Sequence, residues 1–423
     1  MRKLIFILTL ILSQSTFAVL TIEVTGGITG GQPIAIAPFI QPMGMPPPAE
    51  NIAQIIQDDL HRSGQFEIVK QLPETPSQLD AINFPVWQTA ALPYLVAGQI
   101  EGTAQQDYNV EFRLFDVFKT TRMIGLSYKA STKKLRQVAH QISDAIYQAL
   151  TGERGVFSTK VVYVTVKRGP QGSVYQLNLA DADGANPQQM LESSEPILSP
   201  AWSPDGNSVA YVSFENQRTA IYVQDIASGK RQKVSDWKGL NTAPAWSPDG
   251  QRLALSLSKD DNPEIYLLDL KTRALSRLTN SPAIDTEPEW TPDGQSLFFT
   301  SDRGGNPQIY QVATTGGTPK RVTFSGNYNA RARVSPDGKK LALLHSSGQG
   351  YHIAVLDLDS KQLQVLTRTS LDESPTFAPN GSMVMYATGT NLAAVSIDGQ
   401  VQQHIPASDG LEVREPAWSP FLN

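Results

Sequence analysis

Four carboxylates are the residues of this 423-residue chain with the clearest potential for catalysis. They lie in two short segments and are Asp285, Glu287, Asp372 and Glu373. Two carboxyl groups held about 5–9.5 Å apart can cleave a glycosidic bond, one as the acid and the other as base or nucleophile. A glycosidase is therefore one hypothesis for this protein.

Other signatures of catalysis or metal binding are missing from the sequence. There is no cysteine, which excludes thiol catalysis and Cys-bound zinc, and the five histidines are dispersed without ligand-like spacing. The sequence has no Gly-x-Ser-x-Gly elbow, phosphate loop or His-Glu-x-x-His. Asp181–Gly184 is similar to the start of a calcium loop, but Ala185 and Asn186 follow where a ligand and a glycine are needed, which favours a plain turn. We therefore expect no catalytic residue, metal or cofactor.

The elements that must position the carboxylates come from an internal repeat. A turn of the form Ser-Pro-Asp-Gly recurs, and its six prolines are spaced by 44, 44, 44, 43 and 41 residues. The turn copies are Ser203–Gly206, Ser247–Gly250, Thr291–Gly294, Ser335–Gly338, Ala378–Gly381 and Ser419–Phe421. An apolar strand keeps the same period, and each unit is predicted to hold four strands. A repeat of about 40–45 residues with four strands is typical of a β-propeller, so we predict six blades.

The order of the partial repeats predicts how the ring closes. The first unit, Lys160–Leu191, has no turn motif before its strands, and the last turn motif has no strands after it. We expect the C-terminal strand to complete the first blade and leave no open sheet edge.

Residues just before each turn occupy equivalent places and are predicted to ring one mouth of the channel. They are Leu240, Asn241, Ala243, Asp285, Thr286, Glu287, Arg331, Asp372, Glu373 and Arg414. Mixed charges with apolar members suit recognition of a protein segment, because charges select and apolar contacts anchor. A polar, solvent-filled channel without a partner is the alternative.

The remaining segments indicate a secreted two-domain protein. Arg2 and Lys3 precede the apolar run Leu4–Leu12, which predicts a signal peptide over 1–18 with cleavage after Ala18. A β-branched, Gly-rich arm follows at 19–31, then a small α/β domain at 32–152 and the propeller at 156–423. The net charge of −5 indicates neither nucleic-acid binding nor an anionic-lipid surface, and we expect no membrane insertion.

The sequence resembles the TolB family, periplasmic components of the Tol-Pal system of Gram-negative bacteria. The resemblance spans all 423 residues and is carried by Pro33–Phe39, Ser199–Gly206 and Pro416–Pro420. It implies a protein that is not an enzyme, that binds the lipoprotein Pal through the propeller mouth, and that supports outer-membrane integrity and cell division. Carried over by position, the implied Pal face includes Leu240, Ala243 and Thr286, although the family often has a polar aromatic residue at the position of Leu240.

The same resemblance implies a second partner and an assembly state. It assigns binding of the TolA C-terminal domain to the arm, with the residues Val19, Leu20, Thr21, Ile22, Glu23 and Val24. It also implies a monomer and further Tol-Pal or outer-membrane proteins as partners. The alternative is a secreted propeller hydrolase, either a peptidase or a glycosidase. A peptidase would need a Ser, Asp and His set that the short N-terminal domain does not offer.

Overall fold

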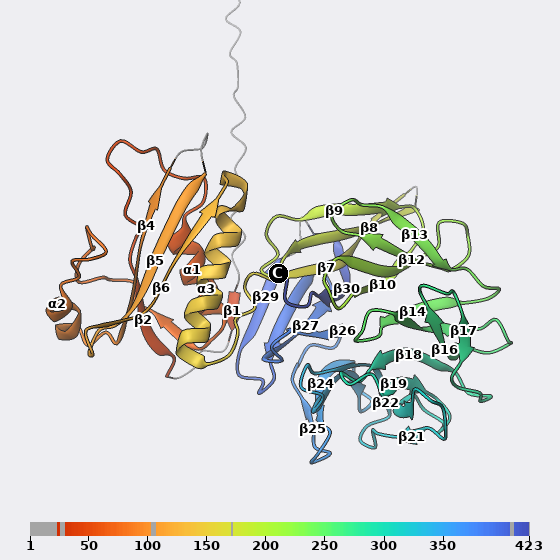
Figure 1. Ribbon diagram of the computed structural model, residues 1–423. Helices are drawn as coiled ribbons and strands as arrows, with labels where there is room; N and C mark the ends of the chain where they lie inside the picture. The colour runs from red at the N-terminus through yellow and green to blue at the C-terminus, as the bar shows by residue number, and fades with distance from the viewer. Residues whose placement is uncertain (1–22, 26–29, 103–106, 171, 407–409, 423) are drawn as a thin grey trace, which may run out of the picture.

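The computed structural model describes residues 23–25, 30–102, 107–170, 172–406 and 410–422. In these ranges an N-terminal α/β domain precedes a ring of six small sheets, and the two lie side by side (Figure 1). This confirms the predicted fold class, an α/β domain followed by a six-bladed propeller. No helix among the described residues is long and apolar enough to cross a membrane.

The N-terminal domain is one five-stranded sheet covered on both faces. The strand order is β3-β2-β4-β5-β6, with β2 parallel to β3 and β4 and the rest antiparallel. The strands are β2 (Gln32–Ile36), β3 (Phe66–Ile68), β4 (Tyr94–Glu101), β5 (Tyr108–Asp116) and β6 (Thr121–Ala130). Helices α1 (Ile52–Arg62) and α3 (Leu135–Thr151) pack on one face, and α2 (Phe84–Thr89) packs on the other. A short 3-10 turn, Thr132–Lys134, leads into α3.

Local sequence signals explain where these helices begin and end. Asn51 caps α1, because its side-chain oxygen accepts from the Gln54 backbone N–H at 3.2 Å. Gly152 ends α3 with a φ of 82°, a conformation that favours glycine. The short helix α2 begins at Phe84, because Pro85 suits a first helical turn.

Each blade is an antiparallel sheet of four strands, with the first strand of the blade next to the channel. The first blade contains β30 (Glu412–Trp418), β7 (Lys160–Gly169), β8 (Gly172–Asp181) and β9 (Gln188–Ser193). The second blade contains β10 (Ile197–Trp202), β11 (Ser208–Ser213), β12 (Ala220–Asp225) and β13 (Arg231–Ser235). The third blade contains β14 (Asn241–Trp246), β15 (Arg252–Leu257), β16 (Glu264–Asp269) and β17 (Leu275–Arg277). The fourth blade contains β18 (Asp285–Trp290), β19 (Ser296–Ser301), β20 (Gln308–Ala313) and β21 (Lys320–Arg321). The fifth blade contains β22 (Tyr328–Val334), β23 (Lys340–Ser346), β24 (His352–Asp357) and β25 (Leu363–Val365). The sixth is β26 (Asp372–Phe377), β27 (Met383–Thr388), β28 (Asn391–Ser396) and β29 (Gln402–Pro406).

The two ends of the propeller sequence meet in the first blade, as predicted. The C-terminal strand β30 pairs antiparallel with β7. The Trp418 indole N–H donates to Thr159 Oγ1 at 2.8 Å, and the Ser419 backbone N–H donates to the Lys160 carbonyl at 2.9 Å. The ring is therefore closed by hydrogen bonds between segments about as far apart in sequence as the propeller allows.

The repeated tryptophans and turns join neighbouring blades. Trp246 and Trp290 donate their indole N–H to the carbonyls of Ala201 and Ala245 in the preceding blade, both at 3.1 Å. In the turns, Gly250 has a φ of 69° and packs against Pro204 of the blade before it. The Ser-Pro-Asp-Gly motif is thus an inter-blade contact as well as a turn.

Candidate binding surfaces at the channel and the domain joint

The channel is lined by a backbone irregularity that occurs once in every blade. Each first strand shifts register at one residue, and that residue has a φ between 50° and 55°. These residues are Ser199, Ala243, Glu287, Arg331, Ser374 and Glu415, and together they line one narrow cavity. A left-handed conformation costs about 1–3 kcal/mol for a residue other than glycine, so the ring around it must hold each bulge in place.

A salt-bridge network crosses this narrow part of the channel. Arg331 Nε lies 2.9 Å from Glu287 Oε1, and Arg331 Nη2 lies 3.4 Å from Glu415 Oε1. Thr300 Oγ1 donates to Glu287 Oε2 at 2.9 Å. Burial disfavours the charged guanidinium, yet Glu415 and Glu287 outweigh it and raise the pKa of Arg331. The predicted ring residues Glu287 and Arg331 therefore neutralise each other inside the channel.

Three of the predicted mouth residues do not line the mouth. Asn241, Asp285 and Asp372 are 0%, 0% and 1% exposed. The Asp285 carboxylate accepts from Arg303 Nη2 at 2.6 Å, that of Asp372 accepts from Thr369 Oγ1 at 2.5 Å, and Asn241 Oδ1 accepts from Ser235 Oγ at 2.7 Å. The side chains of Asn241 and Asp372 tie the preceding segment to the first strand, and that of Asp285 ties it to the loop after β19. The expectation that they are accessible at the rim was wrong for this reason.

Accessible apolar residues surround the start of the first strands instead. Leu240, which was predicted, is 46% exposed, and Ile284 and Leu371 are 50% and 74% exposed. All three stand eight residues before the proline of their turn. Phe324 is 73% exposed in the loop before β22. We call Leu240, Ile284, Phe324 and Leu371 the apolar rim. The repeat spacing that revealed Leu240 could have identified Ile284 and Leu371, whereas Phe324 has no equivalent signal.

The other predicted rim residues are intermediate in exposure. Ala243, Thr286, Glu373 and Arg414 are all partly accessible beside the channel. Burial raises the pKa of the Glu373 carboxyl, and Arg331 opposes this only in part. Arg414 Nε donates to Glu412 Oε1 at 2.6 Å.

The arm is described over three of its residues. Glu23–Thr25 forms β1, which adds to β29 as a fifth, antiparallel strand of the sixth blade (Figure 1). Val24 is opposite Gln403, and Glu23 is opposite His404. The predicted arm residues Val19, Leu20, Thr21 and Ile22 lie outside the described residues, as do the signal peptide and Ala18.

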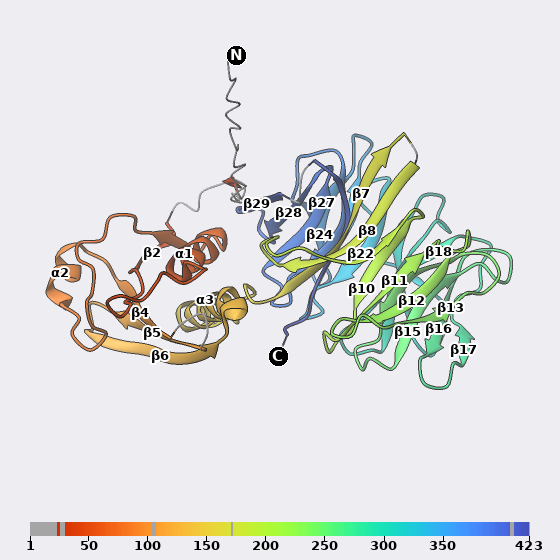
Figure 2. The same ribbon diagram turned by 90° about the horizontal axis from the view of Figure 1, so that it is seen from above.

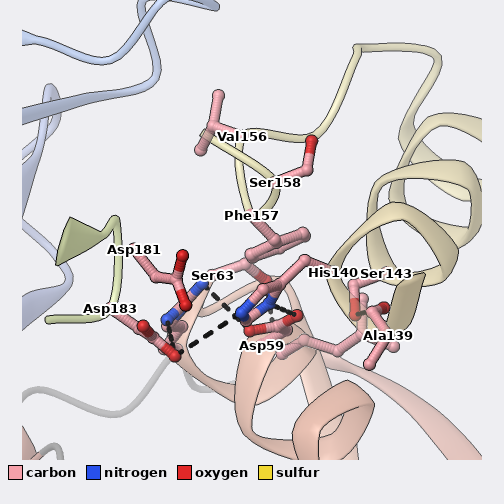
Figure 3. Close-up of polar contacts among 12 residues, drawn as sticks. Asp59, Ser63, Ala139, His140, Ser143, Val156, Phe157, Ser158, Asp181 and Asp183 are labelled. Carbon is pink, nitrogen blue, oxygen red and sulfur yellow. Dashed lines mark hydrogen bonds and ion pairs between the residues drawn. The ribbon is translucent and has the colours of Figure 1, made fainter. Parts of the chain in front are cut away.

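A second polar cluster lies where the two domains meet (Figure 3). His140 from α3 stands between Asp59 from α1 and Asp183 from the loop after β8. His140 Nδ1 lies 2.7 Å from Asp59 Oδ2, and His140 Nε2 lies 3.8 Å from Asp183 Oδ2. All three residues are buried. They are chemically capable of binding a metal ion.

Arginines already occupy the carboxylates of this cluster, so it does not fit a metal. Arg62 Nη2 lies 2.9 Å from Asp59 Oδ1, Arg62 Nη1 lies 3.5 Å from Asp183 Oδ2, and Arg136 also pairs with Asp183. Two guanidinium groups would repel a cation, and their charge balances that of the two carboxylates. The cluster is an ion-paired joint between the domains, which we call the domain joint.

Electrostatics within the joint follow from this arrangement. Burial favours the neutral form of Asp183, but Arg62, His140 and Arg136 outweigh it and hold the pKa of that carboxyl well below its usual range. Burial likewise opposes charge on His140, yet Asp59 and Asp183 raise the pKa of the imidazole. The turn predicted at Asp181–Gly184 is confirmed. Its ion pairs to the other domain were not predicted, because no local pattern reports a contact between distant segments.

Comparison with known proteins now assigns the chain to a family. The model for the TolB beta propeller domain matches residues 147–422, and the model for the TolB amino-terminal domain matches residues 20–123. The chain belongs to the TolB family. The Tol-Pal system protein TolB of Nitrosococcus oceani is 61% identical over 97% of this chain and 96% of its own length. That of Coxiella burnetii is 57% identical over 98% and 96%. The crystal structure of TolB from Acinetobacter baumannii matches with a TM-score of 0.87, at 44% identity, over 95% of this chain and 100% of that one.

Proposed function

We propose that this protein is a periplasmic scaffold of the Tol-Pal system. It links the lipoprotein Pal, at the outer membrane and peptidoglycan, to TolA of the inner membrane, and so supports outer-membrane integrity and invagination during division. It reaches the periplasm through a signal peptide cleaved after Ala18. Membership of the TolB family supports this proposal, because similar relatives carry the Tol-Pal name.

Pal binds at the apolar rim in this proposal, and the exposure of that rim is the observation that carries it. Four large apolar side chains that come shortly before the first strands of their blades are 46–74% exposed. Apolar anchors near the centre of an interface, with partly accessible charges such as Glu373 and Arg414 around them, are typical of protein recognition. The network of Arg331, Glu287 and Glu415 supports the wall behind this surface.

TolA binds the N-terminal arm in this proposal. Glu23–Thr25 already has a strand conformation, held by β29. A segment that pairs with one sheet edge can pair with another, because the main-chain hydrogen bonds are the same. Docking on β29 and capture by TolA are then competing states of the arm, and Pal binding shifts the balance between them.

Scaffolding is favoured over hydrolysis by the contacts of three of the four carboxylates. Asp285 and Asp372 are buried and hydrogen-bonded within their blades, and Glu287 is paired with Arg331. Each of these three carboxylates has a structural partner. We therefore propose that the protein is not an enzyme.

The test is binding of the purified soluble domain of Pal to the immobilised protein. Thr286→Arg and Leu371→Glu are expected to weaken binding at least about tenfold, because each places a charge in an apolar contact. Phe118→Glu is the matched control, since Phe118 is 56% exposed on the other domain. Deletion of residues 19–30 should abolish binding of the TolA C-terminal domain and preserve that of Pal. Unchanged Pal affinity in both rim variants would refute the assignment of the mouth.

A further inference from the structure

Strand β6 is a long sheet edge that no other described element covers. It is the last strand of the N-terminal sheet and pairs with β5 alone. Its ten residues compare with two to six in the outermost strands of the blades. Figure 2 shows β6 along one side of the N-terminal domain, at the edge of its sheet. Such an edge offers backbone N–H and C=O groups to another extended chain.

The strand is already ordered for such pairing. Nine residue pairs fix its register on β5, and Tyr128 stacks on Phe112 with ring centroids 6.5 Å apart. Met123 and Leu126, near its middle, are 39% and 45% exposed. A preformed strand with half-exposed apolar side chains loses little conformational entropy when a partner binds.

The chain segment that contains β6 carries charge of one sign. Residues 117–135 contain five Lys or Arg and no Asp or Glu, although the whole chain has a net charge of −5. Arg122 and Lys129, both exposed, are opposite Phe115 and Asn109 of β5, on the face turned away from α3. The acids of β5 are already engaged: Glu111 with Arg113 at 2.9 Å, and Asp116 with Lys119 at 2.8 Å. The edge therefore presents positive charge on one face.

We propose that β6 binds an extended segment of a partner polypeptide in which alternate residues are acidic. In an added strand every second side chain lies on the same face, so that acidic side chains at this spacing meet Arg122 and Lys129. A second copy of β6 is a poor occupant, because it would bring like charges opposite each other. This surface belongs to the α/β domain and is independent of the rim and the arm.

Titration of the purified full-length protein with two labelled decapeptides tests the proposal. One peptide alternates valine or threonine with glutamate, and the other carries lysine in place of glutamate. Fluorescence anisotropy at low ionic strength should show at least about tenfold tighter binding of the glutamate peptide, weakening as salt is added. Hydrogen exchange should slow at the backbone amides of β6 when this peptide binds.

Charge-reversal variants separate this surface from general attraction. R122E/K129E should lose the preference for the glutamate peptide, whereas K230E/K271E, which reverses two exposed lysines of propeller turns, should retain it. Circular dichroism of both variants checks that they fold. Equal binding by R122E/K129E, or binding without protection of β6, would overturn the proposal. Protection of β6 that grows with protein concentration without peptide would overturn it too, because a second copy would then cover the edge.

Discussion

Replacing Asp183 with asparagine is expected to open the domain joint. Asp183 is 6% exposed and pairs with Arg62 and Arg136, whose side chains are 7% and 21% exposed. Asparagine keeps the volume but removes the carboxylate that Arg62 and Arg136 share, so that Arg62 keeps only Asp59 and Arg136 keeps Asp181 and Glu50 as acidic partners. Removing one partner of a buried ion pair costs about 3–5 kcal/mol. At about 1.4 kcal/mol per tenfold, the equilibrium between docked and open domains should shift more than about a hundredfold.

Trypsin cleavage at Arg154 measures this opening directly. The Arg154 carbonyl accepts from Asn380 Nδ2 at 3.0 Å, and its guanidinium lies 4.1 Å from the centre of the Phe421 ring, both across the domain boundary. Cleavage by dilute protease tracks the open population when opening is fast. Asp225→Asn, at the corresponding hairpin of the second blade, is the control and should cleave like the wild type. An Asp183→Asn protein with wild-type cleavage and wild-type thermal stability would refute this account of the joint.

Three further predictions concern the joint and the ring. His140 has a folded-state pKa above its ordinary value of 6.5, so the stability that protonated His140 contributes is fully present below about pH 6.5 and is lost as the pH rises through the folded-state pKa. Thermal melts at about pH 6 and about pH 9 should show this loss of stability. The variant His140→Gln should remove the difference between the two pH values. Deleting residues 414–423 removes most of β30 and should abolish cooperative unfolding, as followed by circular dichroism. A melting temperature lowered by only a few degrees would show that β7 needs no partner strand. Trp290→Ala should lower the free energy of unfolding by about 3–5 kcal/mol in urea titrations. Trp237→Ala is the control and should have little effect, because Trp237 is 46% exposed. Equal effects of the two substitutions would contradict the inter-blade role of Trp290.

The propeller was predictable because its signals are local and repeated. The turn prolines give the blade count, and the incomplete first and last units give the closure by β30. The same reasoning was less successful for side chains. Repeat symmetry placed Asp285 and Asp372 correctly at the start of β18 and β26, but it could not show that they point into the blade. A bulge follows two residues later, and a proline comes directly after the bulge residue in five of the six first strands, but this proline does not report the direction of the side chain at the start of the strand.

The domain joint could not be predicted from the sequence for a different reason. Asp59, His140 and Asp183 come from segments separated by more than 40 residues, and each has an ordinary local role in a helix or a turn. The spacing of the histidines gave no sign that His140 pairs with two carboxylates. Only the tertiary arrangement shows that Asp183 crosses to the other domain, because ion pairing has no sequence period.

The sixth blade connects the surfaces to which we assign different partners. Its first strand, β26, follows Leu371 of the apolar rim, and its last strand, β29, pairs with the arm. Gln403 of β29 is opposite Val24 of the arm, and its side-chain amide donates to the Arg62 carbonyl at the domain joint. Four hydrogen-bonded strands therefore separate the rim from both the arm and the joint. A partner that strains β26 can act on the arm through a single sheet, which supplies a physical route for coupling between sites without a change in the rest of the ring.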